Sequence, residues 1–258
     1  MINELLLKED KSTVFVFSHP NHELASLGRI SRLQPCRIMY ITDGGGENRC
    51  NETKNVLSEL GLTDNAVFMN LSEDSFYNAI LNLDYEYFQK ISQGIMDELK
   101  CETSPYIFCD AVEFYNPIHD LTFPIVQSLS LSSTVFEIPL AHQTLAGDVV
   151  LQKPSERLKS NSICISLTES EKKMKDYLFQ SKYNSLGDEM DRLIEADVSL
   201  TKFEWLIKDR DCPILPMCDQ VIRYDIRGSE LTSKMIYDQP ITYREHYVPL
   251  TTRILKNG

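Results

Sequence analysis

The chain has 258 residues, of which 42% are hydrophobic and 25% charged, a composition typical of a globular protein with a sizeable core. Its formal net charge of −12 is uneven, because residues 1–129 hold nine basic and 19 acidic side chains, whereas residues 130–258 hold 17 and 19. Neither half offers the basic face that nucleic acids or anionic membranes require. No apolar run approaches the length of a transmembrane segment, and the charged stretch 1–12 lacks the apolar core of a secretory signal.

Short apolar runs alternate with helical patterns in the first half of the chain. Residues 13–17 form a continuous apolar, β-branched and aromatic run, which predicts a central strand buried on both faces. Four more strands and four helices are expected on the same grounds. The strands cover 37–42, 66–71, 106–109 and 134–138, and the helices cover 23–33, 47–60, 84–100 and 119–131.

The second half is less regular. A polar excursion over 145–159 precedes a strand at 163–167, and Thr168 with Glu171 forms a capping box that opens a helix through residue 179. A longer helix is expected over 185–208, with Trp205 in its buried face, and short strands and loops over 213–255.

Seven cysteines are present, an odd number, and none has the spacing of a Cys-x-x-Cys motif. Several lie in apolar runs, among them Cys109 and Cys164. This pattern favours buried, reduced thiols in a cytoplasmic protein over a disulfide framework or a cysteine metal site.

Strands separated by helices of this length predict right-handed crossovers, and so an α/β fold with a mostly parallel, Rossmann-like sheet and helices on both faces. We expect a single domain over 1–258, with a core at 12–140 and a less regular completing half at 141–258. Ligands of such sheets bind beyond the carboxyl ends of the strands. Three segments emerge there, at 18–23, 43–47 and 110–120, and they hold three of the five histidines.

Those three histidines can converge on one point. His19 and His22 flank a tight turn after the first strand, and His119 follows the fourth. Three histidines with an open fourth position form a typical catalytic zinc site, in which the metal lowers the pKa of a bound water to about 7. By spacing alone, ordinary turn and surface histidines remain the alternative.

The same segments resemble the motifs of a known family, the zinc-dependent de-N-acetylases, which include the N-acetylglucosaminyl-phosphatidylinositol deacetylases. The stretch 17–23, with its His-Pro-Asn-His-Glu core, resembles the His-Pro-Asp-Asp-Glu signature. Residues 41–44 resemble the Thr-Asp-Gly motif, Arg49 and Glu52 fit an Arg-x-x-Glu pattern, and 116–120 resemble the His-Pro-Asp-His-Asp segment. The convincing part covers roughly residues 12–130.

The resemblance implies an enzyme that removes an acetyl group from an N-acetylated amino sugar or its conjugate by attack of a zinc-bound water. One Zn²⁺ per chain would be held by His19, His22 and His119. The small-molecule sugar conjugate would be the partner, with homo-oligomerisation open. The remaining implied site residues fall into two groups. The catalytic group is Asn21, Glu23, Asp43 and Asn116, and the substrate-binding group is Arg49, Glu113 and, from a tail motif at 243–246, His246.

Three departures from the family pattern leave two interpretations. Asn21 replaces the aspartate that acts as general base, His22 replaces a ligating aspartate, and Asn116 replaces a histidine near the oxyanion. An amide cannot accept a proton from water at neutral pH. In the first interpretation the site is re-tuned: three neutral imidazoles leave the metal its full charge, and Glu23, Asp43, Glu113 or Asp120 handles the proton. In the second, hydrolysis is lost and the chain is a module that binds a sugar conjugate or a protein.

Overall fold

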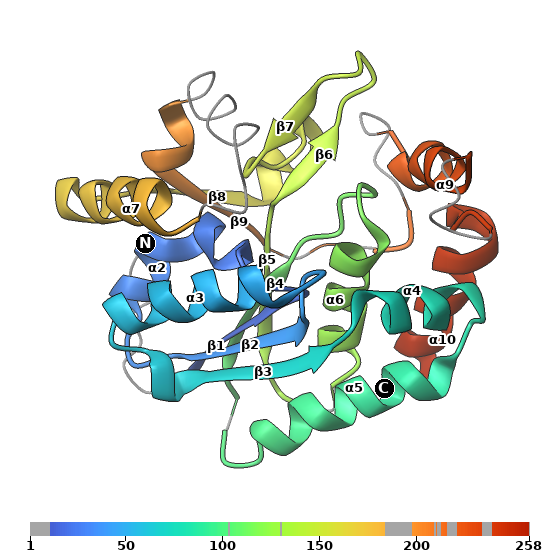
Figure 1. Ribbon diagram of the computed structural model, residues 1–258, viewed down its shortest axis with the longest axis horizontal. Helices are drawn as coiled ribbons and strands as arrows, with labels where there is room; N and C mark the ends of the chain where they lie inside the picture. Colours follow the sequence, from blue (N-terminus) through green and yellow to red (C-terminus); the bar gives the residue numbers. More distant parts are fainter. Residues whose placement is uncertain are drawn as a thin grey trace.

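A seven-stranded sheet with the order β3-β2-β1-β4-β5-β9-β8 forms the centre of the computed structural model (Figure 1). The structure describes residues 11–102, 104–129, 131–183, 198–208, 210, 213–215, 221–233 and 239–257. Strands β1 to β5 pair in parallel, and β9 and β8 continue the sheet in antiparallel pairing. The predicted α/β class with a mostly parallel sheet is therefore confirmed.

The first five strands lie where the apolar runs predicted them. Their bounds are β1 Thr13–Phe17, β2 Arg37–Thr42, β3 Ala66–Leu71, β4 Tyr106–Asp110 and β5 Thr134–Ile138. A two-stranded sheet and the antiparallel edge follow, with β6 Ala141–Gln143, β7 Val149–Leu151, β8 Ser162–Ser166 and β9 Phe203–Lys208. Because β8 and β9 come from the second half of the chain, both halves build one domain.

Helices cover both faces of the sheet, since successive strand side chains point to opposite faces. From β1, Val14 and Val16 pack with the helices α4, α5, α6 and α10, whereas Phe15 and Phe17 face α2 and α3 (Figure 1). The helix bounds are α2 Leu27–Arg32, α3 Glu47–Glu59, α4 Glu73–Leu81, α5 Tyr85–Glu98, α6 Pro117–Gln127, α7 Glu169–Lys182, α9 Arg223–Ser233 and α10 Val248–Asn257. Short 3-10 segments are η1 His22–Ser26, η2 Thr63–Asn65, η3 Glu156–Asn161 and η5 Val198–Thr201, and η6 Tyr243–Tyr247 is a turn of π-helix.

The second half corrects several expectations. Residues 203–208 are the strand β9 and not part of a helix, because they pair with β8 and β5, so Trp205 lies half-buried on a strand. Of the rest of that predicted helix, residues 185–197 lie outside the described residues, and Val198–Thr201 form the 3-10 segment η5. The described tail is helical, where strands and loops were expected, and α4 was not foreseen. Of the cysteines expected to be buried, Cys101 and Cys164 are exposed, the latter because it lies on the edge strand β8.

Hydrogen bonds join the carboxyl ends of β1, β2 and β4, at the edge of the sheet where the site is expected. The backbone N–H and the hydroxyl of Thr42 both donate to the Ser18 carbonyl, at 2.7 and 3.0 Å, and the Ser18 N–H donates to the Asp110 carboxylate at 2.7 Å. Within the described chain, no helix combines the length and apolar character that a membrane crossing requires.

Candidate metal centre

Two of the three histidines come from a strained turn. After β1 the chain reverses through Ser18 to Asn21, and Asn21 adopts the left-handed conformation with φ of 79° before η1 begins. Asparagine and aspartate tolerate this conformation better than other residues with a β-carbon. The turn places His19 and His22 on the same side, with ring centroids 3.8 Å apart.

The third histidine comes from the first turn of α6. Asn116 is the N-cap of this helix, because its amide oxygen accepts from the Ile118 N–H at 2.9 Å, and Pro117 occupies the first helical position. His119 thus projects from a helix start at the carboxyl end of β4.

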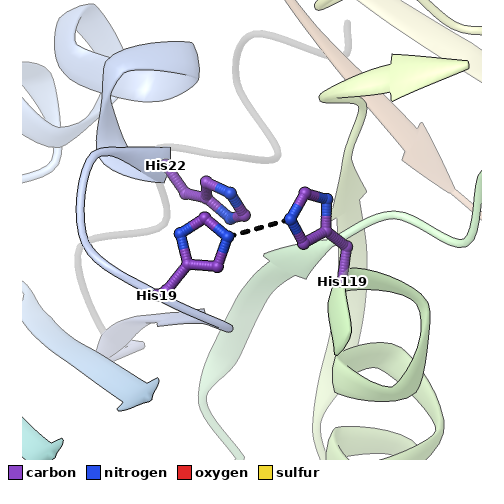
Figure 2. A group of neighbouring side chains, drawn as sticks. All are labelled: His19, His22 and His119. Carbon is purple, nitrogen blue, oxygen red and sulfur yellow. Dashed lines mark hydrogen bonds between the residues drawn. The ribbon is translucent and has the colours of Figure 1, made fainter. Parts of the chain in front are cut away.

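The three imidazoles converge (Figure 2). Nε2 of His19 lies 2.9 Å from Nε2 of His119, and one ligand atom from each of the three rings lies within 4.8 Å of the others. The ring centroids of His22 and His119 are 4.4 Å apart. Among the residues that the structure describes, the cluster has no fourth histidine, cysteine or carboxylate ligand. The arrangement offers three donors and leaves a further position open.

The rings are in the form that binds metals. Burial is the main reason that the pKa of each of the three histidines lies well below its usual value, and the neighbouring rings and the Arg49 guanidinium lower the pKa of His19 and His119 further. Imidazole must be neutral to bind a metal ion. At neutral pH the cluster therefore presents unprotonated nitrogens.

Neighbouring groups restrict the tautomers. The Asn116 amide nitrogen lies 3.1 Å from His119 Nε2, and since its oxygen is engaged as the helix cap, its N–H faces a bare ring nitrogen. His19 Nδ1 lies between the Pro20 carbonyl, at 3.1 Å, and Arg49 Nη1, at 3.2 Å. With the His19 proton on Nε2, the 2.9 Å contact to His119 Nε2 is a hydrogen bond; with the proton on Nδ1, toward Pro20, both Nε2 atoms are unprotonated and can share a cation. This donor set, all imidazole, suits Zn²⁺.

Behind His22 lies a carboxylate that the sequence analysis did not single out. Oδ2 of Asp110, which is fully buried at the end of β4, lies within hydrogen-bond distance of His22 Nδ1, at 2.8 Å. Burial raises the pKa of Asp110 to about 7, against the opposing effect of its hydrogen bonds from Ser18. A lone aspartate at a strand end carries no local signal of this role.

A cavity of about 320 Å³ opens beside the cluster. Its polar wall includes Arg49 and Glu73, the latter the first residue of α4 and a carboxylate that the sequence analysis also missed. Its apolar wall is formed by η1 and the β6–β7 hairpin. The lining residues are His19, Asn21, His22, Leu24, Ala25, Arg49, Glu73, Asn116, His119, Leu140, Ala141, Leu151 and Gln152.

Asn21 lines this cavity with its amide already bonded at both ends. Its nitrogen donates to Glu52 Oε2 at 3.2 Å, and its oxygen accepts from the Thr53 hydroxyl at 3.1 Å. The single Thr53 hydroxyl proton is shared between Asn21 Oδ1 and Glu23 Oε1, which lies 2.8 Å from the hydroxyl oxygen. Asn21 is therefore held in one orientation at the cavity wall, through residues of α3.

Other predicted site residues lie away from the cavity lining. Glu23 is fully buried behind Asn21, where the Tyr183 hydroxyl donates to it at 2.9 Å, and burial raises its pKa. Asp43 accepts from the backbone N–H groups of Gly45 and Glu73, so it fixes the glycine turn after β2.

Two further residues, proposed for substrate binding, accept hydrogen bonds from backbone N–H groups of the protein. Glu113 accepts from the backbone N–H groups of Leu140 and Ala141 at 2.7 and 2.6 Å, and so holds the start of the hairpin. His246 accepts from the Thr242 N–H at 3.0 Å in the π-helical turn. Neither belongs to the cavity lining. Asp120, which follows His119, accepts from the Glu113 N–H and from the Tyr224 hydroxyl.

Two solved structures resemble this chain in the course of the backbone. The deacetylase Dbv21, which acts on the A40926 pseudoaglycone, is 13% identical and has a TM-score of 0.48, with 77% of this chain and 97% of that chain covered. A deacetylase of the teicoplanin biosynthesis pathway is 12% identical with a TM-score of 0.49, and covers 78% of this chain and 100% of its own. No family model and no curated protein matches the chain.

Proposed function

We propose that the chain is a metal-dependent hydrolase that removes an acetyl group from an N-acetylated amino sugar or its conjugate. The observation that carries this proposal is the convergence of three neutral imidazoles on the wall of a cavity, with a position left open. The motif resemblance of residues 12–130 supplies the reaction class, and the donor geometry supports it.

In this proposal His19, His22 and His119 hold one Zn²⁺. The bound ion would supply Lewis acidity, lowering the pKa of a water and polarising the amide carbonyl. The protein keeps the three rings neutral, because burial lowers their pKa values. Their nitrogen lone pairs are then available to the metal ion.

Asn116 is the proposed hydrogen-bond donor to the oxygen that becomes negative during the reaction. Its own oxygen is fixed by the cap of α6, so its N–H group is aimed at the cluster without further ordering. Donors held in place before the reaction are the most effective stabilisers of such an oxyanion.

Glu73 is the proposed base. Asn21 cannot take a proton, and among the described lining residues Glu73 is the one carboxylate. Burial raises its pKa, and Arg49 opposes that shift. A carboxylate with a raised pKa is a better proton acceptor at neutral pH than an exposed one.

The cavity walls suggest how the substrate lies. Arg49 and Glu73 can bind sugar hydroxyls, and the wall of Leu24, Leu140 and Leu151 can receive the acyl methyl group or an aglycone. The volume of about 320 Å³ lies at the lower end of small-molecule sites, in keeping with a sugar-sized ligand. The five described cysteines are free thiols, which fits the reducing cytoplasm as the place of action.

A non-hydrolytic binding module remains the second candidate, because the amide of Asn21 occupies the position of the family's base and is bonded at both ends. One experiment separates the two candidates. The purified chain is stripped with a chelator, reloaded with one equivalent of Zn²⁺, and acetate release from an N-acetylglucosamine conjugate is measured.

We expect acetate release that depends on the added metal and is lost in His119→Ala. The matched control is His142→Gln, which changes a buried histidine near Glu113 that does not line the cavity. Stoichiometric zinc without acetate release would support the binding module. Failure of the wild-type chain to retain zinc would overturn both the metal centre and the hydrolase.

A further inference from the structure

Asp110 is the group that faces the second ring nitrogen of His22. It is the last residue of β4 and has no exposed surface. A single oxygen, Oδ2, lies 2.8 Å from His22 Nδ1 and 2.7 Å from the Ser18 backbone nitrogen.

The contact selects a tautomer of His22. Oδ2 already accepts from the Ser18 N–H, and an ionised carboxylate only accepts hydrogen bonds, so we expect the ring nitrogen at 2.8 Å to carry the proton. Nδ1 is then protonated, and Nε2 keeps its lone pair for the cluster. The Ser18 hydroxyl is the rival partner of Nδ1, at 3.3 Å, and a donated Ser18 proton would require the opposite tautomer.

The contact also fixes the position of the loop. Ser18 directly precedes His19, so the same carboxylate oxygen holds the backbone at the start of the turn and the ring near its end. Both anchors are buried, where such hydrogen bonds are worth most.

We propose that Asp110 is a positioning residue that holds His22 in the Nδ1–H tautomer and aims its Nε2 at the metal position. The expected effect of Asp110 on metal affinity rests on the proposed function. The tautomer of His22 does not, because it can be measured without a metal. Partners that orient ligating histidines typically contribute about 10- to 100-fold in metal affinity.

The first test uses the metal-free wild-type chain. Long-range ¹H–¹⁵N spectra identify the protonated nitrogen of each histidine ring, and we expect His22 to carry its proton on Nδ1. A proton on Nε2 would overturn the inference whether or not the protein binds a metal. A wild-type chain that shows the expected tautomer but binds no zinc would overturn the proposed function and leave the assignment of Asp110 standing.

The second test measures Zn²⁺ affinity by competition with a chelator, using the metal alone as the probe. We expect Asp110→Ala to bind about 10- to 100-fold more weakly, Asp110→Asn to fall between it and the wild type because its amide oxygen still accepts, and Ser18→Ala to stay within about twofold. Equal losses in Asp110→Ala and Ser18→Ala, or none in Asp110→Ala, would overturn the inference. If Asp110→Ala does not fold, as judged by its melting transition, the tautomer of the wild type and the affinity of Asp110→Asn decide.

Discussion

Asn116 uses its two amide atoms for two purposes: its oxygen caps the helix that carries His119, and its nitrogen lies 3.1 Å from Nε2 of that same histidine. The structural and the chemical contribution of one side chain can therefore be separated. Aspartate caps helices as well as asparagine does, but an ionised aspartate donates no hydrogen bond.

Asn116→Asp should lower acetate release about 10²- to 10³-fold while changing the free energy of unfolding little, because the cap survives and the donor to the oxyanion is lost. Asn116→Ala should show the same loss of turnover and an additional destabilisation of about 1 kcal/mol from the missing cap. Steady-state turnover and urea unfolding of both variants check this. Full activity in Asn116→Asp would exclude the oxyanion role.

Cys36 should make the chain sensitive to alkaline pH. Burial raises the pKa of its thiol from 9.0 to about 12. The unfolded chain therefore loses this proton above pH 9 while the folded chain retains it, so the folded state binds more protons, and the free energy of unfolding falls as pH rises toward 12. Below pH 9 the contribution is fully present.

The measurement is urea unfolding of the wild type and of Cys36→Ala between pH 8 and 10.5. The advantage of the wild type should shrink by about 2 kcal/mol across this range, because pH 10.5 lies 1.5 units above the unfolded pKa of 9.0 and each unit corresponds to about 1.4 kcal/mol. Tyrosines and lysines that titrate in both proteins cancel in the difference. Two curves that stay parallel would contradict the prediction.

The parallel half of the fold could be predicted because its signals are local. Strand β1 is a continuous apolar run, and Gly61, which follows the end of α3, adopts a φ of 70°, the left-handed conformation that glycine favours after a helix. Strand β9 could not be predicted, because its strand state depends on pairing with β8 and β5, which are distant in sequence. The described tail helices have the same cause, since Leu250 and Ile254 of α10 find their apolar partners in the core against α5 and α6.

The candidate site divides in the same way. The segments bearing His19, His22 and His119 could be brought together from the sequence, because parallel strands end at one edge and the motifs mark their turns. No sequence motif indicates Asp110 or Glu73. Asp110 reaches His22 only because β4 pairs with β1, and Glu73 lines the cavity only because α4 begins there. Conversely, Glu23 and Glu113 match the family pattern in sequence, yet their carboxylates bond to neighbouring protein groups.

Asn21→Asp should raise the turnover of an N-acetyl amino sugar, because it places a proton acceptor at the cavity wall and aspartate tolerates the φ of 79° at this position. Glu52 limits the gain. Its Oε2 accepts from the Asn21 amide at 3.2 Å, so an aspartate there would face a second carboxylate and hold its proton more tightly.

We therefore expect the double variant Asn21→Asp with Glu52→Gln to exceed the single variant, since the amide of glutamine can donate to the new carboxylate. Turnover as a function of pH checks this, and the rise should begin at lower pH in the double variant. Glu52→Gln alone is the control. If neither variant exceeds the wild type, the proton is handled elsewhere or the chain does not hydrolyse amides.

Glu73 provides the sharpest test of where the proton goes. Glu73→Gln keeps the size of the side chain and the start of α4, whose cap is the Ser72 hydroxyl, but removes the carboxylate from the cavity wall. Loss of a general base typically costs about 10²- to 10⁴-fold in turnover, and we expect a loss in this range with zinc retained.

The matched control is Asp74→Asn. It changes the net charge by the same amount on the same helical turn, but Asp74 is exposed and does not line the cavity. Turnover and zinc content are measured for both variants. A fall in Glu73→Gln with Asp74→Asn unchanged assigns the effect to the carboxylate in the cavity, because a general electrostatic effect of the acidic surface would lower both. Equal activity of Glu73→Gln and the wild type would remove Glu73 as the base and would assign the proton to another group near the cluster.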